Sequence, residues 1–383
     1  MPETGFVQRF PAERLCPSLL RSLAAVALLA LAPVALAQDV ALPVPDGVLP
    51  PEVPADDPVT AAKVGLGKKL YFDGRLSRDD TISCATCHDP RSGFAEHKPV
   101  SEGVGGAKGV RNAPTVLNAA FLREQFWDGR APTLEAQAVL PIINPVEMAM
   151  PDHPAVEAKL RGIPEYGPLF AKAFGDSKIT IARVGQAIAS FERTLLSLDA
   201  PIDRFLAGDA KAISDSAKRG WDLYNGKARC NSCHAHTSVF PLFTDEKYHN
   251  IGVAAKAVDF EKLARQVESH PESLSALAHE PSLNQLGRFL VTKQHQDVGA
   301  FKTPQLRNVA LTAPYMHDGS EKTLRDVIEF YDRGGNPNPW LDGGMRPLGL
   351  TEQEKADLAV LLETFTSGDL GRFDELAKSM PSK

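Results

Sequence analysis

The chain has 383 residues, and at roughly 100–200 residues per domain this length predicts two domains. Its hydrophobic fraction of 43% is normal for a globular protein with a packed core. Its formal net charge of −6 excludes the strongly basic class of nucleic-acid-binding proteins, so we expect no nucleic-acid partner.

Residues 1–37 have the features of a secretory signal peptide. Three arginines precede an apolar run at residues 23–32, and a small-residue cleavage motif ends at Ala37. The run is short for a membrane span and Pro33 ends it, so we favour cleavage before Gln38 over a retained membrane anchor. We therefore predict export to a periplasm, with no membrane span left after cleavage.

The rest of the chain is predicted to be all-α. Residues 38–58 are rich in proline and predict an extended linker or wrapping arm. Apolar residues spaced by three and four predict a helix over 179–197, with Thr180 near its N-cap. Residues 214–225 predict a second helix, and 351–364 a third that opens with a Thr-x-x-Glu capping box. Long alternating patterns typical of strands are missing.

Two Cys-x-x-Cys-His motifs dominate the chemistry that the sequence suggests. They are "SCATCHD" at 83–89 and "RCNSCHA" at 229–235. At the start of a helix, two cysteines at this spacing can form thioether bonds to the vinyl groups of a haem, and the next residue can ligate the iron. Cys16 leaves with the signal peptide. The remaining cysteines all belong to the motifs: Cys84, Cys87, Cys230 and Cys233.

A zinc site and a redox dithiol are the alternatives for such a motif. Zinc would need further Cys or His ligands at suitable spacing, and a dithiol does not call for the histidine. Two copies that use every mature cysteine favour two covalently bound c-type haems. We therefore expect two cytochrome c-like helical domains with one haem each, at residues 59–208 and 209–383.

Longer motifs from both halves resemble the bacterial dihaem cytochrome c peroxidases. The resemblance runs from about residue 65 to residue 365, with the motifs in the family's order and spacing. The motifs are "RNAPTVLN" at 111–118, "FWDGRAPTLEAQA" at 126–138, "NPVEM" at 144–148 and "FKTPQLRNVALTAPYMHDGS" at 301–320.

The resemblance implies that the N-terminal haem reacts with hydrogen peroxide and that the C-terminal haem passes electrons to it. His88 and His234 would be the proximal iron ligands of the two haems. Glu147 would be the acid–base residue on the open face of the first haem, with Gln137 beside it. Trp127 would lie between the haems.

The resemblance also implies a calcium ion near the domain interface. Asn112 and the backbone carbonyls of Thr312 and Pro314 would hold it. Many relatives are dimers, so a homodimer is an option here as well.

The chemistry supports Glu147 independently of the resemblance. Cleavage of the O–O bond requires a proton to move between the two peroxide oxygens, and a carboxylate within hydrogen-bond distance can move it. Apolar neighbours in the sequence predict a raised pKa for Glu147. The alternatives are a surface glutamate in a loop for Glu147 and an ordinary core aromatic for Trp127.

One departure from the family concerns the first haem. Many of these peroxidases carry a histidine in the loop after the first motif, and it caps the iron until the second haem is reduced. Val104 occupies that position and cannot ligate iron. We predict a first haem that is open in the resting oxidised state and needs no reductive activation. His97 is an alternative cap, and Glu102 is a weaker one.

A second departure concerns the second haem, whose axial methionine is usually found where this chain has Tyr331. A tyrosine oxygen favours ferric and higher states of iron, whereas methionine raises the potential. We predict Tyr331 as the ligand. The alternative is a packed helix residue, with Met345 or Met316 ligating instead.

The two departures together resemble the MauG branch of the family, whose members oxidise tryptophans of a methylamine dehydrogenase precursor. MauG passes oxidising equivalents through a tryptophan near the second motif, where this chain has Ala228. Trp221, earlier in the same segment, is an unproven replacement. Specific action on methylamine dehydrogenase is therefore not expected.

Two hypotheses on function follow. In the first, the chain is a peroxide-dependent dihaem oxidoreductase that draws electrons from a small cytochrome c, a copper protein or an oxidisable protein side chain. In the second, it is a dihaem electron carrier without peroxide chemistry. Residues 261–296 are predicted to be a variable helical insertion. Histidines outside the motifs are given no role: His153, His236, His249, His270, His279 and His295.

Overall fold

The computed structural model describes residue 1 and residues 39–268, 277–368 and 370–378. The predicted signal peptide, apart from Met1, lies outside the described residues. The structure is mainly helical, which confirms the predicted fold class. The described residues form only two short strands, β1 (Tyr248–His249) and β2 (Phe301–Lys302), which pair antiparallel.

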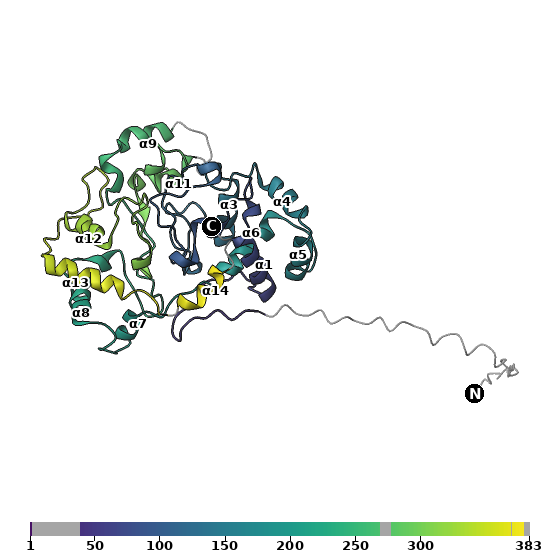
Figure 1. Ribbon diagram of the computed structural model, residues 1–383. Helices are drawn as coiled ribbons and strands as arrows, with labels where there is room; N and C mark the ends of the chain where they lie inside the picture. Colours follow the sequence, from purple (N-terminus) through teal and green to yellow (C-terminus); the bar gives the residue numbers. More distant parts are fainter. Residues whose placement is uncertain (2–38, 269–276, 369, 379–383) are drawn as a thin grey trace. The chain divides into compact units, whose positions relative to one another are not determined.

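A first group of helices surrounds a core in the N-terminal half (Figure 1). α1 and α6 make its closest helix pair because a glycine faces the partner backbone. A Cβ atom on Gly67 would lie 1.8 Å from the carbonyl oxygen of Ala187. The helices are α1 (Ala61–Phe72), α2 (Cys84–Cys87), α3 (Leu134–Ile143), α4 (His153–Arg161), α5 (Tyr166–Phe174) and α6 (Ile181–Glu192).

A second group surrounds a core in the C-terminal half, where α8 packs along α13 (Figure 1). Again a glycine allows the approach, since a Cβ atom on Gly220 would lie 2.3 Å from the carbonyl oxygen of Asp357. The helices are α7 (Pro201–Leu206), α8 (Asp215–Asn225), α12 (Leu324–Asp332) and α13 (Glu352–Glu363).

Side-chain caps begin the predicted helices where the sequence places them. The Thr180 side chain accepts a hydrogen bond from the Arg183 backbone N–H at the start of α6. Ser214 caps α8. Thr351 and Glu354 form the reciprocal capping box of α13. Because such caps satisfy N–H groups that no intrahelical carbonyl can reach, they mark helix starts reliably.

Each core contains a residue from the other side of the domain boundary predicted between residues 208 and 209. The boundary itself stays a prediction. Ile202, in α7, is buried in the second core. Phe373, just before α14 (Asp374–Ala377), is buried in the first core and packs edge-on against Phe94.

The predicted insertion has a small core of its own. α9 (Phe260–Glu268) and α11 (Phe289–Thr292) contribute to it, while residues 269–276 lie outside the described residues. The remaining described helices are single turns of 3₁₀ type: Gly74–Leu76, Pro90–Ser92, Val104–Gly106, Ala119–Phe121, Cys230–Ser232, Val253–Lys256, Asn284–Leu286, His295–Asp297, Val309–Leu311 and Leu370–Phe373.

Residues 39–58 form the extended arm that the prolines predict. The Val40 N–H donates to the Val59 carbonyl, and the Leu49 N–H donates to the Val239 carbonyl in the other half. Several of its apolar side chains pack on a cluster formed by both halves. The arm therefore touches both halves of the described chain.

Candidate functional site

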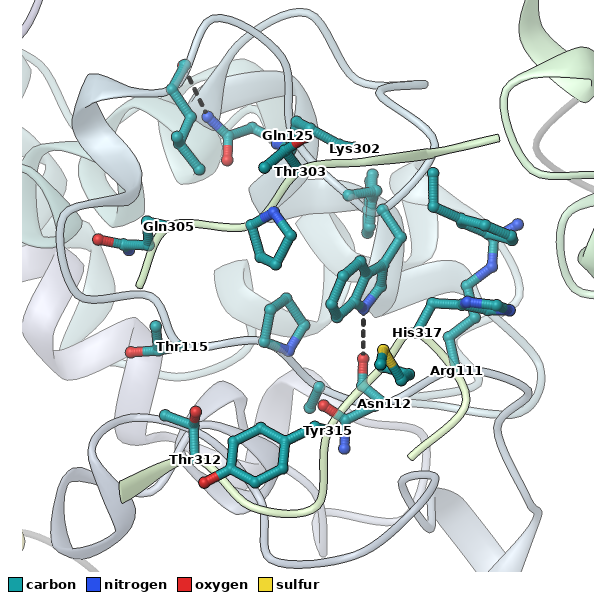
Figure 2. A pocket seen from close by; sticks show the side chains of 18 of the residues that line it. Arg111, Asn112, Thr115, Gln125, Lys302, Thr303, Gln305, Thr312, Tyr315 and His317 are labelled. Atoms are coloured by element: carbon teal, nitrogen blue, oxygen red, sulfur yellow. Dashed lines mark hydrogen bonds between the residues drawn. The ribbon is translucent and has the colours of Figure 1, made fainter. Parts of the chain in front are cut away.

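One cavity of about 550 Å³ lies between the two cores (Figure 2). Its walls come from both halves of the chain and are mainly apolar. Every residue that we predicted for the site lines it: Cys84, Cys87, His88, Asn112, Trp127, Gln137, Glu147, Cys230, Cys233, His234, Thr312, Pro314 and Tyr331.

The first Cys-x-x-Cys pair forms the single turn α2, which a local capping box stabilises. The Ser83 N–H donates to the Thr86 hydroxyl at 3.0 Å. His88 follows directly, and the Tyr71 hydroxyl donates to its carbonyl at 3.1 Å. The Nδ1 atom of His88 is buried without a hydrogen-bond partner, and burial lowers the pKa of this histidine. A neutral imidazole in this state is ready to ligate a metal.

The second pair lies in a 3₁₀ turn that begins at Cys230. The Nδ1 atom of His234 lies 2.9 Å from the Phe243 carbonyl, which leaves Nε2 free. The Tyr224 hydroxyl donates to the His234 carbonyl. Burial lowers the pKa of His234, so this imidazole is also neutral. A backbone carbonyl on Nδ1 is the usual means of orienting a metal-binding histidine.

Tyr331 extends from α12 into the cavity near the second motif. Its hydroxyl makes no hydrogen bond to any described residue. Burial raises the pKa of Tyr331, and the nearby Cys233 and Cys230 raise it further. The phenol is thus half-buried, protonated and without a hydrogen-bond partner among the described residues.

Glu147 lies at the first motif, in the turn that follows α3. Its N–H donates to the Asn144 carbonyl at 3.1 Å, and its own carbonyl accepts from the Val104 N–H at 2.8 Å. Burial raises the pKa of Glu147, as its apolar neighbours predict, while Arg130 and Asn144 oppose the shift. The turn therefore holds an acid with a raised pKa in the cavity wall.

Trp127 lies where segments of the two halves meet. Its indole Nε1 donates to the Asn112 carbonyl at 2.9 Å, and the Asn112 N–H donates to the His317 carbonyl at 2.8 Å (Figure 2). The His317 ring meets the indole edge-on and stacks on Phe301 with 3.6 Å between centroids. Gln285 of the insertion hydrogen-bonds His317 at 2.6 Å. The indole orientation is therefore set by both halves.

Comparison with known proteins agrees with this arrangement. Residues 61–211 match the family model described as di-haem cytochrome c peroxidase. The methylamine utilization protein MauG of Methylorubrum extorquens is 41% identical over 313 residues, covering 81% of this chain and 80% of that protein. The chain belongs to the di-haem cytochrome c peroxidase and MauG family. Family membership implies two c-type haems.

Other family members are similar at comparable levels. The cytochrome-c peroxidase IdrP1 of Denitromonas iodatirespirans is 39% identical over 350 residues, covering 89% of this chain and 91% of that protein. A solved MauG-like protein associated with microbial copper homeostasis is 32% identical, with a TM-score of 0.72 over 86% of this chain and 96% of that one. The diheme peroxidase BthA of Burkholderia thailandensis, at 24% identity, shares the fold with a TM-score of 0.66 over 85% of this chain and 89% of that one.

The residues of the cavity fit the two haems of a di-haem family member. All four cysteines that the structure describes are free, and all face the cavity. Each motif offers one neutral, half-buried histidine, and the His88 Nδ1 atom still lacks a partner. Apolar walls with a few convergent polar groups suit a large planar cofactor.

No helix among the described residues is long and apolar enough to cross a bilayer.

The loop after the first motif contributes Ser101, Gly109 and Val110 to the cavity wall, but none of the three candidate positions for a cap lines it. Val104 is buried and is not part of the cavity wall. The Nε2 atom of His97 lies 3.1 Å from the Leu311 carbonyl, and Glu102 pairs with Lys98 and Lys108. Neither His97 nor Glu102 lines the cavity. Met345 and Met316 do line it, so they remain alternatives to Tyr331.

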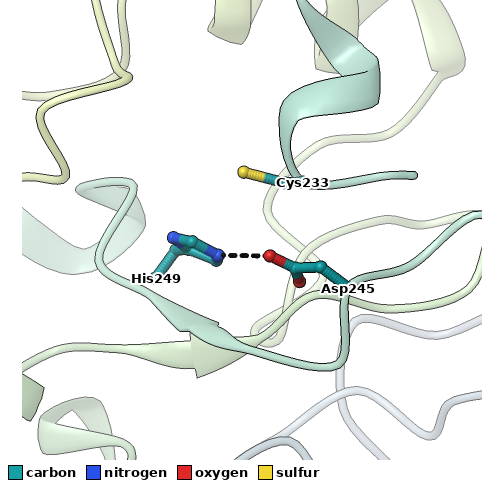
Figure 3. Close-up of side chains that lie close together, drawn as sticks. All are labelled: Cys233, Asp245 and His249. Carbon is teal, nitrogen blue, oxygen red and sulfur yellow. Dashed lines mark hydrogen bonds and ion pairs between the residues drawn. The ribbon is translucent and has the colours of Figure 1, made fainter.

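The three residues predicted for calcium share one part of the cavity wall. The Asn112 side chain donates to the Lys98 carbonyl at 3.0 Å, which leaves its Oδ1 atom for a cation. A different group, Cys233, Asp245 and His249, is close enough to hold a metal in the described part of the chain (Figure 3). Because Cys233 is a haem-attachment candidate, we assign this group to the second motif and not to a separate site.

Sequence reasoning missed two residues of the cavity wall. Glu192 is buried at the end of α6, and His279 of the insertion lies 3.1 Å from the Asn144 amide nitrogen. Burial and nearby Arg130 and Arg111 lower the pKa of His279 to about 4. A signal for Glu192 was present, because it follows Ile188 by one helical turn and so shares the apolar face of the helix.

Proposed function

We propose that the chain is an exported, periplasmic dihaem oxidoreductase that reduces hydrogen peroxide. In this proposal, residues 59–208 hold the peroxidatic haem and 209–383 the electron-transferring haem. One observation carries the proposal: a single cavity holds both haem motifs, with Glu147 and Gln137 at the first and Tyr331 in its wall near the second.

The ligand assignment follows the cavity walls. His88 and His234 would ligate the two irons, and the four motif cysteines would form the thioether bonds to the haems. Tyr331 would be the second ligand of the C-terminal haem. Its place in the cavity wall supports this role, because the hydroxyl makes no hydrogen bond to a described residue and the oxygen is left available for an iron. The first haem would keep one open face, since neither His97 nor Glu102 lines the cavity.

The open haem supplies the site that binds peroxide and accepts its oxidising equivalents. Glu147 takes the proton from the inner peroxide oxygen and returns it to the outer one, so that the O–O bond breaks with water as the leaving group. A raised pKa suits this work, because the carboxyl must both accept and release a proton near neutral pH. Gln137 orients the peroxide by hydrogen bonding.

Trp127 is proposed as the link between the haems. The indole is fixed through its Nε1 hydrogen bond and through the His317 ring. A fixed aromatic ring between two redox centres offers a route for electrons without a change of conformation. Calcium bound by Asn112, Thr312 and Pro314 would hold the segments on either side of this link.

The electron source is proposed to be a small cytochrome c or a copper protein. A MauG-type role, oxidation of side chains on a partner protein, is the second candidate, and a homodimer is compatible with either. One observation favours the second candidate: Trp221 stacks on Tyr224 at 5.4 Å between centroids, and the Tyr224 hydroxyl bonds the His234 carbonyl. Ala228, by contrast, is buried and has no aromatic ring.

Peroxide consumption by the fully oxidised holoprotein tests the proposal. We expect reaction within the mixing time of a stopped-flow experiment and without prior reduction, and turnover when reduced cytochrome c or a reduced copper protein is added. Glu147→Gln should slow the reaction with peroxide by about 10²-fold or more, while Glu165→Gln, an exposed control, should not. A chain that takes up electrons but never reacts with peroxide would be an electron carrier instead.

A further inference from the structure

Glu192 is a buried acid in the cavity wall that the proposed reaction does not use. Its side chain is 4% exposed, it lines the cavity, and its Oε2 atom has no hydrogen-bond partner. An ionised carboxylate is strongly disfavoured in a buried place without a partner. The geometry therefore points to a neutral carboxylic acid.

The charged and titratable groups around Glu192 do not neutralise it. They are Tyr71 on α1, Cys84 on α2, Glu135 on α3 and the neighbouring Arg193. Arg193 donates to Glu135 at 2.5 Å, so the one cation among them is already matched by another carboxylate. Burial raises the pKa of Glu192 to about 8, with Arg193 opposing the shift and Glu135 adding to it.

Glu192 lies at the same end of the cavity as Glu147. Burial raises the pKa of the Cys84 thiol, and Glu192 and Glu147 both contribute to that shift. The two carboxyl groups are therefore both near the first haem motif. Glu135, which interacts with Glu192, lies on α3 two residues from Gln137 and has a side chain that is 19% exposed. Glu135 is thus a partly solvent-exposed carboxylate that interacts with Glu192.

We propose that Glu192 stores a proton beside the peroxidatic haem and supplies it to the reduction of peroxide. The inference rests on the proposed function. Reduction of one peroxide to two waters breaks the O–O bond and consumes two electrons and two protons. The electrons come from the donor protein, and Glu147 only relocates a proton that peroxide already carries. Glu192 supplies one of the two further protons and is reprotonated from water on the Glu135 side.

Infrared spectroscopy of the oxidised holoprotein tests the stored proton without any turnover. We expect a carboxylic-acid C=O band at pH 7 that disappears on titration through about pH 8 and is absent from Glu192→Gln. Glu135→Gln is the matched variant. It frees Arg193 and removes a negative charge, so it should shift the titration of Glu192 to lower pH. Because the pKa of Glu147 is raised as well, the band is read from the difference between the wild-type and Glu192→Gln spectra. A difference spectrum without a carboxylic-acid band at pH 7 would overturn the proposal.

The pH dependence of peroxide turnover with a reduced donor protein tests the supply step, because the two further protons are consumed together with the donor's electrons. The wild-type turnover rate should fall by about tenfold per pH unit above the Glu192 titration, and the rate for Glu192→Gln should be about 10²-fold lower at pH 7 and lack this fall. An unchanged pH profile in Glu192→Gln would exclude the role. If the wild-type protein shows no reaction with peroxide, the proposed function fails, while the infrared band still reports whether Glu192 holds its proton.

Folding is checked by haem content and by the visible spectrum of each variant. If Glu192→Gln does not bind both haems, Glu192→Asp is measured in its place. This variant keeps the carboxylic acid but shortens the side chain by one methylene group. For that variant we expect a retained titration with a slower reaction. A wild-type rate in Glu192→Asp together with a missing infrared band would contradict the proposal.

Discussion

In the proposed function, single side chains decide which branch of chemistry this di-haem family member carries out. Val104, at the position proposed to lack a capping ligand, is buried outside the cavity wall, and Tyr331 places a phenol in the cavity near the second motif. Both departures from the family pattern could be seen in the sequence, because Val104 and Tyr331 lie at fixed distances from family motifs. Glu192 was not predicted: its place on the apolar face of α6 could be read from the sequence, but the groups that α1, α2 and α3 place around it could not.

Replacement of Tyr331 by phenylalanine tests the ligand at the residue scale. We expect Tyr331→Phe to keep both haems but to change the visible spectrum of the second one, because an oxygen ligand is lost. Tyr166→Phe is the control, since the Tyr166 hydroxyl bonds Asp73 and lies outside the cavity wall. If the Tyr331→Phe spectrum equals that of the wild type, Met345 or Met316 becomes the ligand to test.

At the scale of elements, the close approach of α1 and α6 positions the first haem motif. Tyr71 at the end of α1 holds the His88 carbonyl, and α6 ends at Glu192 in the cavity wall. Gly67 allows this approach because its missing Cβ leaves room for the Ala187 carbonyl. Packing of the two helices therefore sets the geometry around the first haem motif.

Two glycines of α1 provide a matched pair for a stability measurement. Gly67→Ala should lower the free energy of unfolding by about 3 kcal/mol, because the new methyl group would overlap a backbone oxygen. Gly65→Ala meets no atom within 4 Å and should raise it by about 0.5–1 kcal/mol, because alanine loses less backbone entropy in a helix. Denaturant titration measures both. Equal effects of the two substitutions would contradict the packing described here.

Elements with local signals could be predicted, and contacts between distant segments could not. The caps at Thr180 and Thr351 depend on residues three positions away, so the sequence contains them in full. The contact of Gln285 with His317 joins the insertion to a family motif. No local pattern reports such a pair, because it depends on how both segments fold onto the cavity.

At the scale of the whole molecule, the two cores share one cavity, and their segments interlock around it. Trp127 from the N-terminal half is held beside His317 from the C-terminal half. Phe373 returns from the C-terminus to the first core. These crossings fix the two haem motifs relative to each other, which direct electron transfer between the haems requires. The sequence predicted the two motifs and their common family, but not these crossings.

Trp127→Phe tests the link between the halves. The substitution removes the indole N–H that bonds the Asn112 carbonyl, and it shrinks the ring between the proposed haem sites. We expect slower electron transfer between the haems, measured by following the reduction of each haem separately, with ligation unchanged. Trp340→Phe, at the edge of the insertion core, should leave the transfer rate as it is. Equal rates in the wild type and Trp127→Phe would remove Trp127 from the route.

The central claim is that one haem has an open face and the other does not. Low-temperature electron paramagnetic resonance of the untreated ferric holoprotein measures this directly. The account predicts one high-spin signal from the first haem and one low-spin signal from the second, and loss of the high-spin signal after one equivalent of hydrogen peroxide. Two low-spin signals that persist after peroxide would contradict it.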